Sequence, residues 1–114
     1  IDASAVRAWV EKEFGEVVDL LTKIRSDTTG PKRERLYMLG VSANQIDKPE
    51  IAVESLQGLM EIGGLSEQYP HYEAQAAYIL VQRLSEPEAQ RYASLIAEKY
   101  SDTLYYNSTV RSYL

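Results

Sequence analysis

Apolar residues recur along the chain at the three- and four-residue spacing of amphipathic helices, and no stretch shows the strict alternation of a β-strand. The clearest stripes share this spacing: Val17, Leu21 and Ile24; Ala52, Leu56 and Leu59; and Ala89, Ala93 and Ile96. The pattern predicts an all-α protein. Seven helices are expected, over residues 2–13, 15–26, 31–46, 48–61, 70–84, 86–100 and 103–114.

Two of these helices are expected to begin in the same way. The stretches DKPE (47–50) and SEPE (85–88) each offer a capping residue, a variable residue, Pro and Glu. Asp47 and Ser85 are predicted N-caps, because their side chains can accept from first-turn N–H groups, and Pro is tolerated in that turn. Gly15 is expected to form the corner between the first two helices.

The apolar stripes repeat along the chain. Val17, Ala52 and Ala89 begin equivalent stripes, at offsets of 35 and 37 residues. A period in the mid-thirties, built from two antiparallel helices, is typical of a helical solenoid. One domain over residues 1–114 is therefore expected, with units at about 1–29, 30–69 and 70–101 and a final helix at 102–114. An ordinary helical bundle with accidental periodicity is the alternative.

The central unit resembles the tetratricopeptide repeat (TPR) family. Leu39-Gly40 precedes Ala52 by the family's usual interval, Leu56 follows four residues later, and Tyr69-Pro70 closes the unit. The resemblance implies a right-handed α-solenoid of about three antiparallel helix pairs plus a C-terminal helix.

The flanking units match the family's pattern less well. Ala76-Ala77 stands where Leu-Gly would, Ala89 matches the family's Ala, and EKYSDTLY (98–105) is similar to the common YPDS ending. Ser4-Ala5 replaces Leu-Gly in the first unit. Small residues let paired helices approach closely, while Leu56 and Ile96 fill the space behind them. The small residues that would do this are Gly40, Ala52, Ala77 and Ala89.

Composition argues against several classes of function. The net charge is −5 and the pI is near 4.9, which argues against a nucleic-acid binder, since such a protein needs a basic face. The chain has no cysteine, hence no thiolate metal site, and no apolar run of the roughly 20 residues that a membrane helix needs.

Candidate catalytic groups are sparse. His71, the single histidine, could pair with Glu73 or a nearby Tyr, but no nucleophile elbow or metal-binding spacing accompanies it. Gly63-Gly64 is an isolated pair and not a phosphate loop. The expectation is a protein without enzymatic activity, cofactor or metal.

Tyrosine is unusually frequent, with nine residues against one Phe and one Trp. In a TPR-like array the first helix of each pair lines the concave face. The resemblance implies that nine residues form a partner-binding surface there: Trp9, Glu34, Tyr37, Val41, Asn44, His71, Tyr78, Gln82 and Tyr105. The alternative is that the tyrosines only pack between helices.

Two functions are expected from these features. The first is a protein-interaction module that binds a peptide or helix, neutral or basic because of Glu34 and the net charge. TPR grooves that bind a C-terminal carboxylate use Lys, Arg and Asn. Among the predicted groove residues of the central unit only Asn44 is one of these types, so binding of a carboxylate tail in this way is not expected. The second is a structural spacer or dimerisation segment of a longer solenoid, with homo-oligomers forming through the apolar C-terminal helix.

The chain begins without Met, so a fragment of a longer protein is expected. The YPDS-like endings resemble TPR-type proteins of the bacterial cell envelope, which makes the periplasm the suspected compartment and leaves the cytoplasm open. Partner and oligomeric state do not follow from the sequence.

Overall fold

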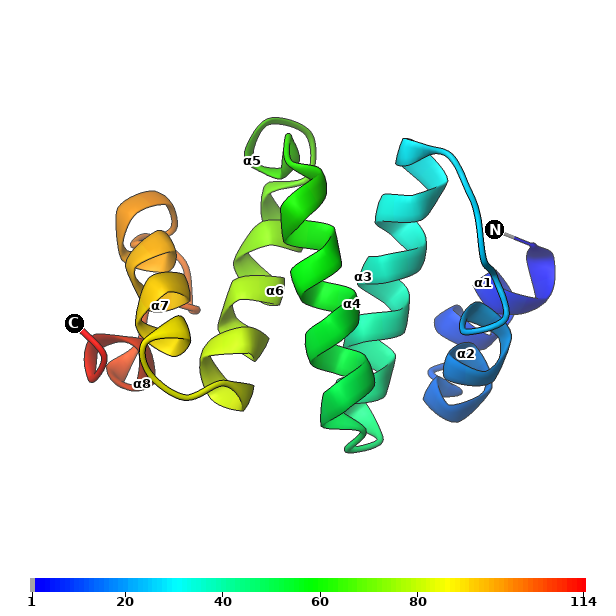
Figure 1. The fold of residues 1–114 in the computed structure, drawn as a ribbon, viewed down its shortest axis with the longest axis horizontal. Helices are drawn as coiled ribbons and strands as arrows, with labels where there is room; N and C mark the ends of the chain where they lie inside the picture. Colours follow the sequence, from blue (N-terminus) through cyan, green and yellow to red (C-terminus); the bar gives the residue numbers. More distant parts are fainter. Residues whose placement is uncertain (1) are drawn as a thin grey trace. The chain divides into compact units, whose positions relative to one another are not determined.

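A computed structural model describes residues 2–114 (Figure 1). Within these residues it is helical and has no strand, which confirms the predicted all-α class. The chain divides into two compact units, one reaching to Ile62 and the other running from Gly63 to Leu114. The helices of the first unit are α1 (Ala3–Val10), α2 (Phe14–Leu21), α3 (Thr29–Gln45) and α4 (Pro49–Ile62). Those of the second are α5 (Leu65–Gln68), α6 (Pro70–Arg83), α7 (Glu88–Lys99) and α8 (Ser108–Arg111).

The corner between α1 and α2 differs from the sequence-based expectation. Asp2 begins α1, with its Oδ1 accepting from the Ala5 N–H at 3.0 Å. The chain then turns at Lys12, whose φ is 58°, and not at Gly15, which lies inside α2. Glu13 N–H donates to the Ala8 carbonyl at 2.8 Å across this turn, so backbone bonds stabilise a left-handed residue that is not glycine.

The turn between α3 and α4 also shifts a predicted cap. Asp47 adopts a left-handed conformation with φ 56°, and the N–H of Lys48 donates to the Ala43 carbonyl at 2.8 Å. This pattern closes the C-terminus of α3. The Lys48 carbonyl accepts from Ala52 at 3.1 Å, so Lys48 precedes α4 and Asp47 is not its N-cap. Similarly, Pro87 and not Ser85 directly precedes α7.

Helices α3 and α4 lie side by side and share the most extensive contact in the first unit (Figure 1). The predicted small residues explain this closeness. A Cβ built on Gly40 would lie 2.4 Å from Cδ2 of Leu56, so Leu56 occupies the place of the missing side chain. Ala52 and Leu56 are fully buried, as the stripe pattern requires. Helix α2 packs on the other side of α3 and supplies Val17 and Leu21 to the same core.

The second unit is built on the α6–α7 pair. Its core side chains come from both helices and include Ala77 and Ala89, which are both fully buried. Helix α5, a single turn that the sequence did not reveal, follows Gly63 and Gly64, whose φ values are 80° and 72°. Such left-handed positions suit glycine, which has no Cβ to clash with the backbone.

The predicted C-terminal helix over 103–114 is mostly absent. Residues 101–107 form turns, and only Ser108–Arg111 is helical. Asn107 explains the late start, because its Oδ1 accepts from the Val110 N–H at 3.3 Å and caps α8 at this position. The fully buried Val110 anchors α8 in its unit.

Candidate functional site

The nine predicted partner-binding residues are divided between the two units. The first unit holds five of them, on α1 and α3: Trp9, Glu34, Tyr37, Val41 and Asn44. The second unit holds four, on α6 and in the segment after α7: His71, Tyr78, Gln82 and Tyr105.

Trp9 and Tyr37 meet in the first unit. Their ring centroids are 5.8 Å apart with an interplanar angle of 63°, an edge-to-face contact between α1 and α3. Phe14 on α2 extends the group, with its ring centroid 6.2 Å from that of Trp9. All three side chains are half-buried. Edge-to-face contacts stabilise aromatic groups beyond area burial, so these rings are held in place while part of their surface faces solvent.

The four predicted residues of α3 share one face by helical spacing but differ in accessibility. Glu34 is exposed, while Tyr37 and Asn44 are half-buried. Val41 is only 6% exposed, so its side chain serves packing and offers a partner almost no contact area.

Tyr78 and Tyr105 meet in the second unit, with ring centroids 5.5 Å apart. Hydrogen bonds hold the segment 103–107, which carries Tyr105. Thr103 donates through its hydroxyl and its N–H to the Tyr100 carbonyl, at 2.7 and 3.1 Å, and Asn107 Nδ2 donates to the Leu104 carbonyl at 3.2 Å. Tyr105 therefore contacts α6 from a turn and not from the predicted helix.

His71 and Gln82 are both exposed on α6. The His71 ring lies edge-on to Tyr72 at 4.4 Å, and Tyr72 in turn stacks on Tyr69 at 4.9 Å. The sequence-based prediction placed neither tyrosine in the partner-binding surface. Their spacing is the only signal that could have grouped them, because residues 69 and 72 are one helical turn apart.

Glu73, one of the candidate partners of His71, belongs to a buried polar cluster. Its Oε1 accepts from the Ser66 hydroxyl at 2.7 Å and from the Tyr100 hydroxyl at 3.0 Å. Lys99 Nζ lies 3.6 Å from the same oxygen and donates to Ser66 Oγ at 3.0 Å. The cluster joins α5, α6 and the end of α7, and supplies the hydrogen bonds that a buried carboxylate requires.

The hydrogen bonds of this cluster connect α5, α6 and the end of α7. Burial raises the pKa of the Tyr100 hydroxyl, which keeps it protonated and able to donate. The Ser66 proton is directed at Glu73, and the ammonium of Lys99 is paired.

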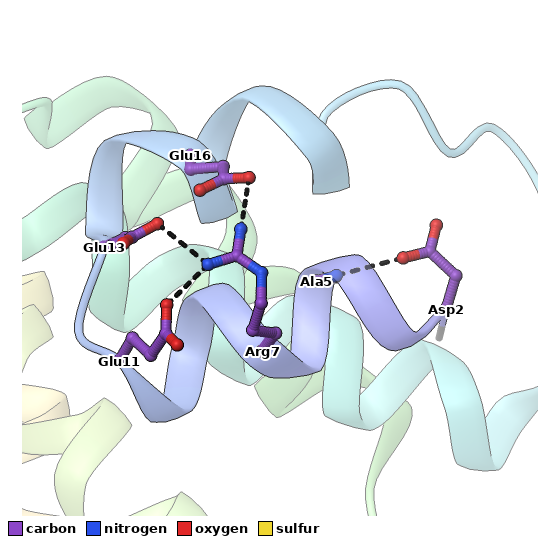
Figure 2. A network of polar contacts seen from close by, with 6 residues as sticks. All are labelled: Asp2, Ala5, Arg7, Glu11, Glu13 and Glu16. Atoms are coloured by element: carbon purple, nitrogen blue, oxygen red, sulfur yellow. Dashed lines mark hydrogen bonds and ion pairs between the residues drawn. The ribbon is translucent and has the colours of Figure 1, made fainter.

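Arg7 on α1 forms the centre of a second, exposed network (Figure 2). Its guanidinium donates to Glu11, to Glu13 at 3.2 Å and to Glu16 at 2.7 Å. The bond to Glu16 contributes most to raising the pKa of Arg7 above its usual range. The neighbouring Glu16 carboxyl raises the pKa of Glu13, although Arg7 acts to lower it, and Glu13 and Arg7 both lower the pKa of Glu16. Three carboxylates thus surround a single cation.

Two further kinds of site are absent from the described residues. Residues 2–114 contain no group of three or more acidic or histidine side chains that could hold a metal ion. No helix among them is long and apolar enough to cross a membrane.

No protein-family model matches the chain, and no curated protein or solved structure is significantly similar to it. The resemblance to the TPR family therefore stays a prediction.

Proposed function

We propose that this chain is a non-enzymatic protein-interaction module that binds a peptide or helix of a partner protein. The observation that carries the proposal is the contact between Trp9 and Tyr37, two half-buried aromatic side chains whose ring centroids are 5.8 Å apart. The Tyr78–Tyr105 contact is its counterpart in the second unit.

Such aromatic pairs suit binding for an energetic reason. Large rings give much contact area while losing little side-chain entropy, and rings already fixed by a neighbour lose still less on binding. Trp and Tyr also keep a polar group at the edge of the ring, which suits an exposed surface. These properties make Trp9, Tyr37, Tyr78 and Tyr105 the proposed anchors.

The partner segment is proposed to be neutral or basic. Glu34 is exposed one helical turn before Tyr37, and the chain has a net charge of −5. Charge complementarity affects both the rate of encounter and the choice of partner, and it disfavours an acidic segment here.

The proposed absence of enzymatic activity is supported by the polar groups of the second unit. The Ser66 hydroxyl donates to Glu73 at 2.7 Å, and Tyr100 donates to the same oxygen. These bonds satisfy a buried charge, and a structural role accounts for all of them.

The TPR-like architecture belongs to the same proposal. The Gly40–Leu56 packing between α3 and α4 supports a repeat with small residues at its helix contact. The stacking of successive pairs into a right-handed solenoid stays a prediction.

A structural spacer or dimerisation segment is the second candidate. Leu104 is 95% exposed, and Leu114 is also exposed, on either side of α8. Burying these two side chains would release water from apolar surface. Their burial would therefore favour association of the chain with another molecule through this end.

A peptide-library selection tests the proposal. Displayed peptides of about 15 residues are selected on the immobilised chain, and the strongest binder is titrated by calorimetry. Truncation of a hot-spot aromatic costs about 2 kcal/mol or more. Tyr37→Ala is therefore expected to weaken a peptide that binds the first unit at least roughly ten-fold, and Tyr78→Ala a peptide that binds the second unit. Tyr113→Ala is the matched control and should change little. Binding that survives both anchor substitutions but disappears when residues 106–114 are removed, with circular dichroism showing that the other helices stay folded, would favour the second candidate.

A further inference from the structure

The outer face of α1 carries apolar side chains that no other part of the first unit covers. Val10 is 71% exposed and Val6 45%, and in the described part of that unit they are the exposed large apolar residues. They lie four residues apart and therefore share one face of the helix. Ala5 and Ala8 bury the opposite side of α1 against the core. A helix whose second face is also apolar is suited to a second packing partner.

Trp9 borders this face on one side, and the Arg7–Glu11 ion pair borders it on the other. Trp9 lies between the buried side and Val6 by helical spacing, and its ring is half-buried. Arg7 and Glu11 follow Val6 and Val10 by one position each, so their ion pair borders the valines on the other side. The surface is thus an apolar strip with an indole along one edge and ionic groups along the other.

The ionic edge has an excess of negative charge. Figure 2 shows the Arg7 guanidinium held between the carboxylates of Glu11, Glu13 and Glu16, three anions around one cation. Residues 2–19 carry five carboxylates against two basic groups, a net charge of −3. A guanidinium or ammonium brought to this edge would find acceptor oxygens that Arg7 alone cannot neutralise.

We propose that the Val6–Val10 face of α1 docks an amphipathic helix of a partner protein, with apolar residues over the valines and Lys or Arg beside the Arg7–carboxylate network. A helix is the expected shape because valines four residues apart form a ridge that fits the groove of a second helix. A second copy of this chain is disfavoured, since two such faces would bring like charges together.

This surface goes beyond the aromatic site proposed above, although Trp9 borders both. The two can be separated, because Tyr37 contacts Trp9 from the core side whereas Val6 and Val10 point outward. Loss of one surface need not affect the other.

The test uses a designed helical peptide of about 18 residues with Leu on one face and Lys on the other, and an acidic twin with Glu in place of Lys. Trp9 is the single tryptophan, so its fluorescence reports on peptide binding at this place. The basic peptide is expected to bind at least ten-fold more tightly than its twin, and its affinity should fall as salt is added.

Variants assign the binding to α1. Val6→Ser combined with Val10→Ser should weaken the basic peptide at least ten-fold, and both positions are exposed, so the fold should be kept. Leu104→Ser, which removes an exposed apolar side chain in the other unit, should have no effect. Equal binding by the double variant, equal binding by the acidic twin, or self-association of the unliganded chain in sedimentation would each overturn the inference. Loss of library-peptide binding in Tyr37→Ala, with the basic peptide still bound, would leave both proposals standing.

Discussion

Gly40 on α3 lies directly against Leu56 on α4. A Cβ at position 40 would be 2.4 Å from Cδ2 and 2.5 Å from Cγ of Leu56, closer than carbon atoms can approach. Leu56 is fully buried, so moving its Cγ away by a change of rotamer would push the side chain into its packed neighbours. The absence of a single methyl group at position 40 therefore determines how closely the two helices pack.

Gly40→Ala is expected to destabilise the chain by about 1–3 kcal/mol. Overpacking costs that much, and the better helix propensity of Ala, worth about 1 kcal/mol, offsets only part of it. Urea denaturation measures the effect. Gly58→Ala on α4 is the matched control, because a Cβ there meets only Leu36 Cδ1 at an ordinary 3.6 Å, so it should be neutral or stabilising. Equal effects of the two substitutions would mean that the α3–α4 contact is looser than described.

The Asp27–Arg35 ion pair should make stability depend on pH. Arg35 Nε and Nη2 donate to the two Asp27 oxygens at 2.8 and 3.1 Å, and both side chains are largely buried. These bonds lower the pKa of Asp27 below its ordinary 3.8. A lowered folded-state pKa stabilises the fold above pH 3.8, and this contribution is lost as the pH falls through the folded-state value.

Asp27→Asn tests this ion pair. It should cost about 1–3 kcal/mol at pH 7, and the difference from the unsubstituted chain should shrink below pH 3.8. Thermal melts between pH 2 and 7 measure it. A difference that stays constant across this range would show that the charge of Asp27 does not contribute.

Tyr100→Phe is expected to destabilise the second unit by about 1–2 kcal/mol. The substitution removes one of the two hydroxyl donors to the buried Glu73 carboxylate, and a buried acceptor that loses a partner costs roughly this much. Tyr92→Phe removes a hydroxyl on α7 that does not contact Glu73 and serves as the control. If urea denaturation gives the same small effect for both, the cluster contributes no stability through this bond.

Ser42→Ala is expected to be neutral or to stabilise by about 1 kcal/mol. The Ser42 hydroxyl is buried on α3 without a hydrogen-bond partner among the described residues, and leaving a hydroxyl unsatisfied costs about that much. Alanine also has the higher helix propensity. A loss of more than about 1 kcal/mol in denaturation would reveal a bond that forms in solution.

The helical stripes could be predicted because burial and periodicity are local signals. Val17, Ala52, Leu56 and Ala89 are all fully buried, as their spacing indicates. The close approach at Gly40 was also predictable, since a small residue facing a leucine across two helices has few other uses.

Other features depend on contacts that a linear pattern does not contain. The turn at Lys12 relies on backbone bonds that overcome the cost of a left-handed lysine. The final helix begins at Ser108 and not at residue 103, because Asn107 caps its N-terminus. Residues 103–106 form turns instead.

The candidate site was predicted only in part for the same reason. The Trp9–Tyr37 contact joins two of the predicted partner-binding residues. Phe14 completes this aromatic group from α2, a helix for which no binding role was predicted. Val41 shows the limit of a pattern carried over from a family, because its face of α3 is covered at that point. Glu73 accepts from Ser66 on the short helix α5, which the sequence did not reveal, and from Tyr100, which lies 27 residues away, so no sequence motif indicates this cluster.

Hydrogen–deuterium exchange of the chain with its selected library peptide tests the proposed binding function most directly. The account predicts slower exchange at the proposed anchors, in α1 and the half of α3 around Tyr37, or in α6 around Tyr78 and the turn at Tyr105, with residues 108–114 unchanged. Protection confined to residues 108–114, with the segments around Trp9, Tyr37 and Tyr78 exchanging as in the free chain, would contradict it.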